Sequence, residues 1–147
     1  MAILYKLLFY PARLYWHFTR PVVHGAGAII EYDDKLLMVR LTYGNSRLWS
    51  FPGGLINRQE PANLAAHREL YEELGIAVKL NKLGTIKAKA DDRTVNGTCF
   101  YAKLDKKPSL IIDHHEIAEA KWWPKTALPA INEVAEAELK LYNQSRI

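Results

Sequence analysis

A run of glycines, acids and one arginine in the middle of the chain restricts its fold more than any other feature. The run has the spacing G-x5-E-x7-R-E-[apolar]-x-E-E-x-G-[apolar], and its members are Gly54, Glu60, Arg68, Glu69, Leu70, Glu72, Glu73, Gly75 and Ile76. Pro61 suits the first turn of a helix, and Gly75 suits a left-handed helix end. The run therefore predicts a loop, a helix that continues to about Leu74, and a stop.

Three acids of this helix are predicted to lie close together. Glu69, Glu72 and Glu73 are related by i, i+3 and i+4, so their carboxylates project from one face. Arg68 can neutralise only part of their charge. The remaining charge and the oxygen ligands predict a site for a hard divalent cation, Mg²⁺ or Mn²⁺. A solvated acidic face is the alternative, but it would not require the glycine pair before the helix, which lets the backbone approach a ligand closely.

The complete run resembles the signature of the Nudix hydrolases, and Phe51-Pro52-Gly53-Gly54 leads into it as in the MutT-type members. The resemblance implies an α/β (α+β) fold, a Nudix α/β/α sandwich with a mixed β-sheet, over residues 21–147. It also implies metal-dependent hydrolysis of a nucleoside diphosphate linked to another moiety.

The resemblance assigns metal and base roles to particular residues. Glu69, Glu72, Glu73 and the Gly53 carbonyl would bind the metal. Glu72 or Glu73 would be the general base within the run, and Glu116, in Asp-His-His-Glu, is the candidate outside it. For Glu116 the alternative of a solvated loop acid stays open, and the two preceding histidines are expected to be exposed.

Supporting and substrate-binding roles follow from the same resemblance. Arg68 would orient the glutamates as part of the catalytic set, and Glu60 would pair with Arg68. Gly54 and Gly75 would shape the loop and the helix end. Two residues outside the run are expected to bind substrate, and each has an alternative. Arg40 would contact a phosphate or be a surface charge, and Asn132 would read a purine base, in a register uncertain by one residue.

The substrate is predicted by elimination. No proline lies in residues 77–107, where ADP-ribose pyrophosphatases of this family show one, and markers for diadenosine polyphosphates and coenzyme A are not apparent. A MutT-like conversion of a nucleoside triphosphate to the monophosphate and pyrophosphate is therefore the default. A capped or triphosphorylated RNA end is the alternative substrate. A different class, a non-catalytic nucleotide sensor tethered to a partner or membrane, is disfavoured because no acid of the run is missing.

Composition limits the remaining choices. With 147 residues, 49% of them hydrophobic and 24% charged, the chain suits one globular domain expected in the cytoplasm. The single Cys99 can form no intrachain disulfide and is expected to be a buried thiol. A net charge of +4 suits a phosphate-rich small molecule without selecting one, and there is no DNA-binding motif.

Residues 1–20 form an arm that the resemblance does not cover. Apolar side chains recur in the arm at helical spacing: Ile3, Leu4, Leu7, Leu8, Leu14, Tyr15 and Phe18. We expect an amphipathic helix, bent at Pro11, that packs through this stripe on the domain or on a second copy in a homodimer. Weak contact with a membrane surface is the alternative. In either case the arm is expected to dock and not to take part in catalysis.

The other elements follow from periodicity and turn residues. Residues 22–32 and 35–41 are expected to form a hairpin around Asp33-Asp34. Further strands are predicted at residues 48–51, 77–90, 93–104 and 119–123, and a helix at 131–142. Trp122 and Trp123 would face opposite sides of the last strand.

Overall fold

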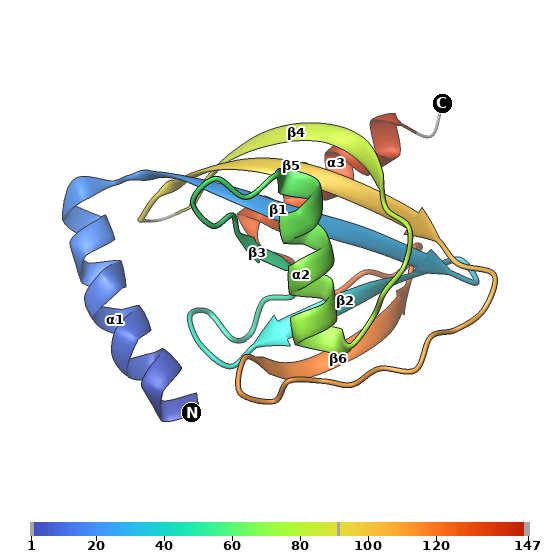
Figure 1. Ribbon diagram of the computed structural model, residues 1–147, viewed down its shortest axis with the longest axis horizontal. Helices are drawn as coiled ribbons and strands as arrows, with labels where there is room; N and C mark the ends of the chain where they lie inside the picture. Colours follow the sequence, from blue (N-terminus) through green and yellow to red (C-terminus); the bar gives the residue numbers. More distant parts are fainter. Residues whose placement is uncertain (1, 91, 146–147) are drawn as a thin grey trace.

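The computed structural model describes residues 2–90 and 92–145, with side chains of the first helix described from residue 7 onward. Figure 1 shows helices on both sides of one twisted sheet. In chain order the elements are α1 (Ala2–Thr19), β1 (Val22–Tyr32), β2 (Lys35–Leu41), β3 (Gly53–Leu55), α2 (Ala62–Leu74), β4 (Asn81–Lys89), β5 (Thr94–Lys103), β6 (Ile117–Pro124) and α3 (Glu133–Gln144).

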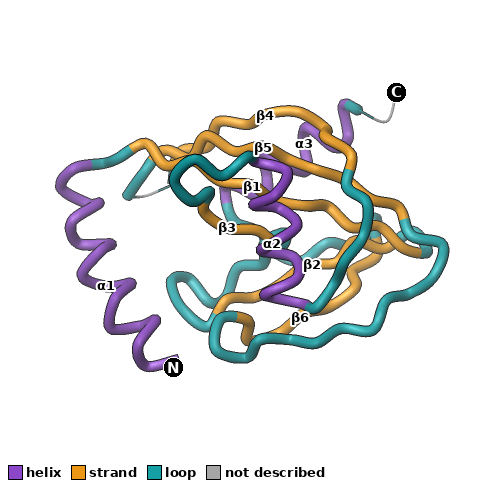
Figure 2. Tube along the Cα trace, viewed as in Figure 1, coloured by secondary structure: helices purple, strands orange, loops and turns teal. Residues whose placement is uncertain are grey.

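The sheet is mixed, as the sequence predicts. Its order is β4-β5-β1-β2-β6, with β3 paired to β1. Strands β1 and β5 run parallel, and the other pairs are antiparallel. The predicted β1–β2 hairpin is present, and its turn residues Asp33 and Asp34 have positive φ angles of 49° and 55°. Figure 2 shows α2 and α3 separated by the sheet, which is the expected α/β/α arrangement.

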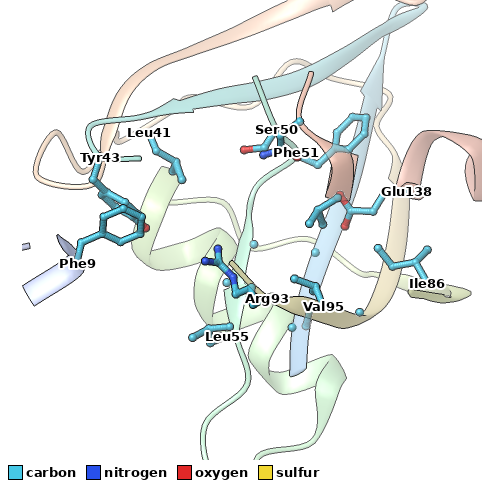
Figure 3. A pocket seen from close by; sticks show the side chains of 18 of the residues that line it. Phe9, Leu41, Tyr43, Ser50, Phe51, Leu55, Ile86, Arg93, Val95 and Glu138 are labelled. Carbon is cyan, nitrogen blue, oxygen red and sulfur yellow. The ribbon is translucent and has the colours of Figure 1, made fainter. Parts of the chain in front are cut away.

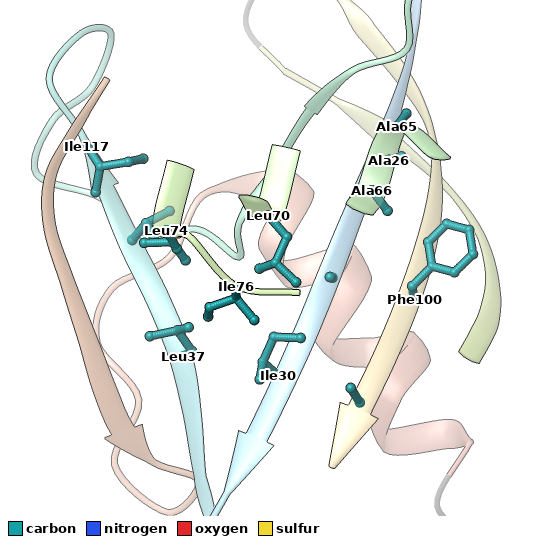
Figure 4. Packing of buried hydrophobic residues seen from close by; sticks show 13 residues of the cluster. Ala26, Ile30, Leu37, Ala65, Ala66, Leu70, Leu74, Ile76, Phe100 and Ile117 are labelled. Carbon is teal, nitrogen blue, oxygen red and sulfur yellow. The ribbon is translucent and has the colours of Figure 1, made fainter. Parts of the chain in front are cut away.

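Alternating side chains of β1 and β2 supply two cores. Ile30 and Leu37 join the cluster under α2, which Figure 4 shows. Ile29 and Leu36 join the cluster on the α3 side. The alternation arises because successive residues of a strand point to opposite faces. Trp122 packs on the first cluster and Trp123 on the second, which confirms that they face opposite sides of β6. Cys99 is fully buried, as predicted.

Two predicted strands were misplaced. Residues 48–51 make only isolated bridges, Val39 with Ser50 and Trp49 with Ile131. The strand that pairs with β1 is Gly53–Leu55 instead, because the small residues of β1 allow the glycines to approach. Strand β4 begins at Asn81 and not at residue 77, because Ile76, Val78 and Leu80 pack on the core under α2.

Helix α1 is present but faces the domain with a different side from the one expected. The predicted stripe is largely exposed, with Leu14 and Phe18 at 62% and 79% of their full accessibility. The half-buried positions are Phe9, Ala12, Arg13 and Trp16. The helix continues through Pro11. No helix in the described part of the chain is long and apolar enough to cross a bilayer.

Candidate active site

Two glycines bring the loop before α2 against β1 and against the acids of α2. Gly53 has a φ angle of 154°, and a Cβ there would lie 2.5 Å from the Ala26 carbonyl oxygen. A Cβ on Gly54 would lie 2.5 Å from the Glu69 carboxyl carbon. Only glycine therefore fits both positions without displacing its neighbours. The glycine pair packs Glu69 directly onto the backbone of the loop.

Arg68 connects the loop to the helix. Its Nε and Nη2 donate to the two carboxylate oxygens of Glu60 at 2.8 and 2.9 Å, a bidentate pair. Its Nη1 donates to Glu69 at 2.6 Å and to Glu72 at 3.4 Å, and Nη2 also donates to the Leu55 carbonyl. The hydrogen bonds from Arg68 lower the pKa of Glu60 to about 2. The pairing of Glu60 with Arg68 is thus present as the sequence predicts.

The three helix acids differ in burial although they share a face. Glu73 is 3% exposed and accepts a hydrogen bond from the Gly53 amide at 3.1 Å. Burial, and then the charge of Glu69, raise its pKa well above the usual value. Burial also raises the pKa of Glu69, against the lowering effect of Arg68. Glu72 lies at the solvent edge, with its side chain 60% exposed. Gly75 ends the helix in the predicted left-handed conformation, with φ 67° and ψ 20°.

Glu116 lies close enough to this cluster to affect its electrostatics. Its charge contributes to the raised pKa values of Glu69, Glu73 and the phenol of Tyr43. Its loop is attached to α2, where the Asp113 amide donates to the Glu73 carbonyl at 2.9 Å, and to the end of β2. His114 and His115 are exposed, as expected. The fold therefore brings the predicted outer acid to the cluster, over a separation of more than forty residues.

The donor set suits a hard divalent cation. Four carboxylates share the neighbourhood, and the one arginine beside them is largely occupied by Glu60. Within the described residues no three acidic, histidine or cysteine side chains already converge as an ion-binding group. Glu69 instead accepts a hydrogen bond from Arg68, and Glu73 accepts one from the Gly53 amide. Burying a charged carboxylate such as Glu73 is costly unless a cation compensates its charge. The donor set therefore fits a divalent metal ion.

The two predicted substrate residues lie in different surroundings. Arg40 donates to the Ser46 carbonyl at 2.9 Å and to Glu119 at 3.1 Å, and it lies outside the pocket described next. Its position therefore gives no support to a phosphate contact. The Asn132 side-chain oxygen caps α3 by accepting from the Ala135 amide at 2.9 Å. Asn132 also lines the pocket.

A pocket of about 410 Å³ lies beside the glycine loop (Figure 3). Its walls come from α1, β1, β5, the loop and α3, and Arg93 and Glu138 are the charged side chains that line it in the described residues. Glu138 is 6% exposed, and burial raises its pKa to about 8. It makes no hydrogen bond or ion pair with a described residue.

Neither Arg93 nor Glu138 was predicted from the sequence to belong to the site. A signal for Glu138 exists, because it shares the buried face of α3 with Ala135 and Tyr142 at helical spacing. No comparable signal marks Arg93, which lines the pocket from the connection between β4 and β5.

Comparison with known proteins identifies the family. The model of the NUDIX domain matches residues 22–144. The chain belongs to the Nudix family. Since the match begins after α1, that helix lies outside the part of the chain that the Nudix domain accounts for.

Two curated relatives resemble parts of this Nudix chain. A MutT-like protein of Streptomyces ambofaciens is 32% identical over 68 residues, which are 44% of this chain and 43% of that protein. An ADP-ribose pyrophosphatase of Mycobacterium tuberculosis is 46% identical over 66 residues, or 40% of this chain and 31% of that protein. The matched region is thus less than half the length of either relative.

A solved structure supports the fold independently. The crystal structure of a MutT NUDIX hydrolase from Burkholderia pseudomallei aligns with a TM-score of 0.74, over 82% of this chain and 97% of that one. The sequence identity is 22%, so the likeness concerns the Nudix fold alone.

Proposed function

We propose that this Nudix chain is a divalent-metal-dependent pyrophosphohydrolase that cleaves a nucleoside diphosphate linked to another moiety. The observation that carries the proposal is the position of the acid cluster next to the pocket. Gly53 and Gly54 line the pocket, and the same two glycines contact Glu73 and Glu69. A substrate in the pocket would therefore place its anhydride at the glycine loop, next to the acids.

In this proposal some residues bind the metal and others orient them. Glu69, Glu72, Glu73 and the Gly53 carbonyl would hold the metal. When bound, the metal would neutralise phosphate oxygens and make an attacking water more acidic. Arg68 would keep the Glu69 carboxylate oriented, since it donates to that carboxylate at 2.6 Å.

The general base would be a carboxylate that can face the attacking water. Glu72 and Glu116 are both at least partly open to solvent, whereas Glu73 is buried. Glu116 is therefore the candidate outside the helix and Glu72 the one within it. Replacing each of them by glutamine separates the two.

The substrate class proposed first is a nucleoside triphosphate, cleaved to the monophosphate and pyrophosphate. A pocket of about 410 Å³ has room for a nucleoside. The Streptomyces relative is named MutT-like and the Mycobacterium relative an ADP-ribose pyrophosphatase. ADP-ribose is therefore the second substrate to examine, together with a triphosphorylated RNA end.

A panel of nucleotides with Mg²⁺ or Mn²⁺ tests the proposal. Ribo- and deoxyribonucleoside triphosphates, ADP-ribose, diadenosine tetraphosphate and a triphosphorylated RNA are incubated with the protein, and phosphate and pyrophosphate release are measured. At least one substrate should be hydrolysed, and EDTA should abolish the reaction. Glu73→Gln protein purified in the same way controls for contaminating phosphatases. Full activity without metal would refute the metal-dependent mechanism, and nucleotide binding without turnover would favour the sensor.

A further inference from the structure

The pocket beside the glycine loop is not built by the Nudix domain alone. Leu8, Phe9, Ala12 and Trp16 of α1 line it. These positions follow helical spacing and therefore share one face of α1. The helix that lies outside the family match thus supplies an apolar wall of the candidate substrate site.

An ionic cluster attaches this face of α1 to the start of β5. Asp92 is 5% exposed and lies between two arginines. Its Oδ2 is 3.6 Å from Nε of Arg13 on α1, and its Oδ1 accepts from Nη1 of Arg93 at 3.0 Å. A buried acid needs such partners, because an unpaired charge away from water is costly. The contact therefore favours one orientation of α1, with Arg13 turned inward.

Aromatic contacts set the shape of the wall. The Arg93 guanidinium lies 4.7 Å from the centre of the Trp16 ring, and the Phe9 and Tyr43 rings are 4.8 Å apart. Figure 3 shows Phe9 and Tyr43 at one end of the pocket and Glu138 at the other, with Arg93 between them. The α1 side thus carries aromatic rings, with the Arg93 guanidinium over one of them, whereas the acids of α2 adjoin the glycine loop.

We propose that α1 is a specificity element of the substrate site, in which Phe9 and Trp16 contact the nucleobase. The inference rests on the proposed function. An aromatic wall suits a base because every base has a π-face that stacks on such rings. The acid cluster would hold the anhydride at the glycine loop through the metal, so the uncharged end of the substrate is directed to α1. Preference for nucleotides over substrates without a base then depends on a segment outside the Nudix domain.

Single substitutions on the two faces of α1 test this in the full-length protein. Trp16→Ala and Phe9→Ala change the inner face, whereas Leu14→Ala and Phe18→Ala change the exposed face of the same helix. We expect Trp16→Ala to raise KM for the best nucleotide of the panel about tenfold, the loss of one base stack, with kcat nearly unchanged. Trp16→Phe, which keeps a ring, should restore much of the affinity, and the exposed-face variants should match the wild type.

A substrate without a base separates recognition from general damage. Tripolyphosphate keeps the anhydride, so its hydrolysis should not change in Trp16→Ala or Phe9→Ala. Equal loss on tripolyphosphate and nucleotides would mean that α1 only supports the fold, and the inference would be wrong. Inner-face variants that behave like Leu14→Ala would also overturn it while leaving nucleotide hydrolysis intact. Wild-type protein that neither binds nor hydrolyses any nucleotide, as measured by equilibrium dialysis and product release, would overturn the proposed function and the inference together.

Discussion

Two buried glutamates are accommodated in opposite ways. Glu31 accepts hydrogen bonds from Tyr142 at 2.6 Å, Tyr101 at 2.7 Å and Lys125 at 2.7 Å. Burial alone would raise the pKa of Glu31, but these donors lower it to about 2. Glu138 has burial without such donors, and its pKa rises to about 8. Glu31 therefore stabilises the fold as a charged hub, whereas Glu138 is an uncompensated acid at the pocket.

Replacing Glu138 by glutamine should make stability less dependent on pH. The Glu138 carboxyl titrates near 4.5 when unfolded and near 8 in the folded protein. The stabilisation from the neutral Glu138 carboxyl is therefore fully present below pH 4.5 and is lost as pH rises to 8. The free energy of unfolding falls over this range by at most about 1.4 kcal/mol per pH unit. The Glu138→Gln variant should lack this loss and be more stable than the wild type at pH 9.

Urea denaturation of wild type and variant at pH 5 and pH 9 measures the effect. Glu136→Gln, at an exposed position of the same helix, is the control. If the difference in unfolding free energy between wild type and Glu138→Gln is the same at both pH values, Glu138 is not the buried, uncompensated acid described above.

Glutamine substitutions in the acid cluster should separate metal binding from base catalysis. Glu73→Gln should lower kcat by about 100-fold or more, because it removes a charged ligand. It should not destabilise the metal-free protein, since Glu73 is buried with its pKa raised. Glu72→Gln and Glu116→Gln, assayed in parallel across pH, test the two bases. Full activity of Glu116→Gln would leave Glu116 as a solvated loop acid and assign the base to the helix.

At the scale of elements, the glycine loop depends on the absence of side chains. Gly54→Ala would bring a methyl group to 2.5 Å from the Glu69 carboxyl carbon. Either the loop or Glu69 must move, so we expect a loss of stability of about 1–3 kcal/mol and a marked loss of kcat. Thermal unfolding and product release measure the two effects. Arg58→Ala, an exposed position in the same loop, is the control, and normal activity of Gly54→Ala would mean that the position of Glu69 is unimportant.

The elements that the sequence predicted well are those set by local geometry. Helix α2, its glycine stop and the β1–β2 hairpin follow from residue spacing and turn chemistry within a few positions. The strand at Gly53–Leu55 was missed because glycines have low intrinsic strand propensity, and only pairing with β1 makes them extended. The apolar stripe of α1 predicted to pack is exposed, because periodicity reveals apolar positions without revealing their partners.

The candidate site shows the same division between local and distant contacts. The pairing of Arg68 with Glu60 and the shared face of the helix acids were predictable from spacing along the chain. Arg93 and Trp16 are more than seventy residues apart in the sequence, so no local pattern predicts their contact. The sequence therefore indicated the chemistry of the site better than the shape of its pocket.

In the whole molecule, the residues that form the cores are different from the residues of α1 that complete the pocket. Neither core cluster includes a described residue of α1. The helix attaches instead through Asp92, Tyr43 and Arg93, and the last two also line the pocket. Its outer face, with Leu14 and Phe18, is exposed, and a second copy or a membrane surface stays a prediction for that face.

Removal of residues 1–20 tests this separation. Because neither core includes a described residue of α1, we expect the truncated protein to fold and to hydrolyse tripolyphosphate with Mg²⁺. Nucleotide KM should rise at least as much as in Trp16→Ala, since the whole apolar wall is lost. This differs from the sequence-based expectation of an arm that only docks, which predicts unchanged nucleotide turnover. Sedimentation and liposome flotation of the full-length and truncated proteins measure whether the outer face of α1 mediates self-association or lipid binding. Unchanged nucleotide KM together with lost self-association or lipid binding would show that α1 serves only as a docking arm.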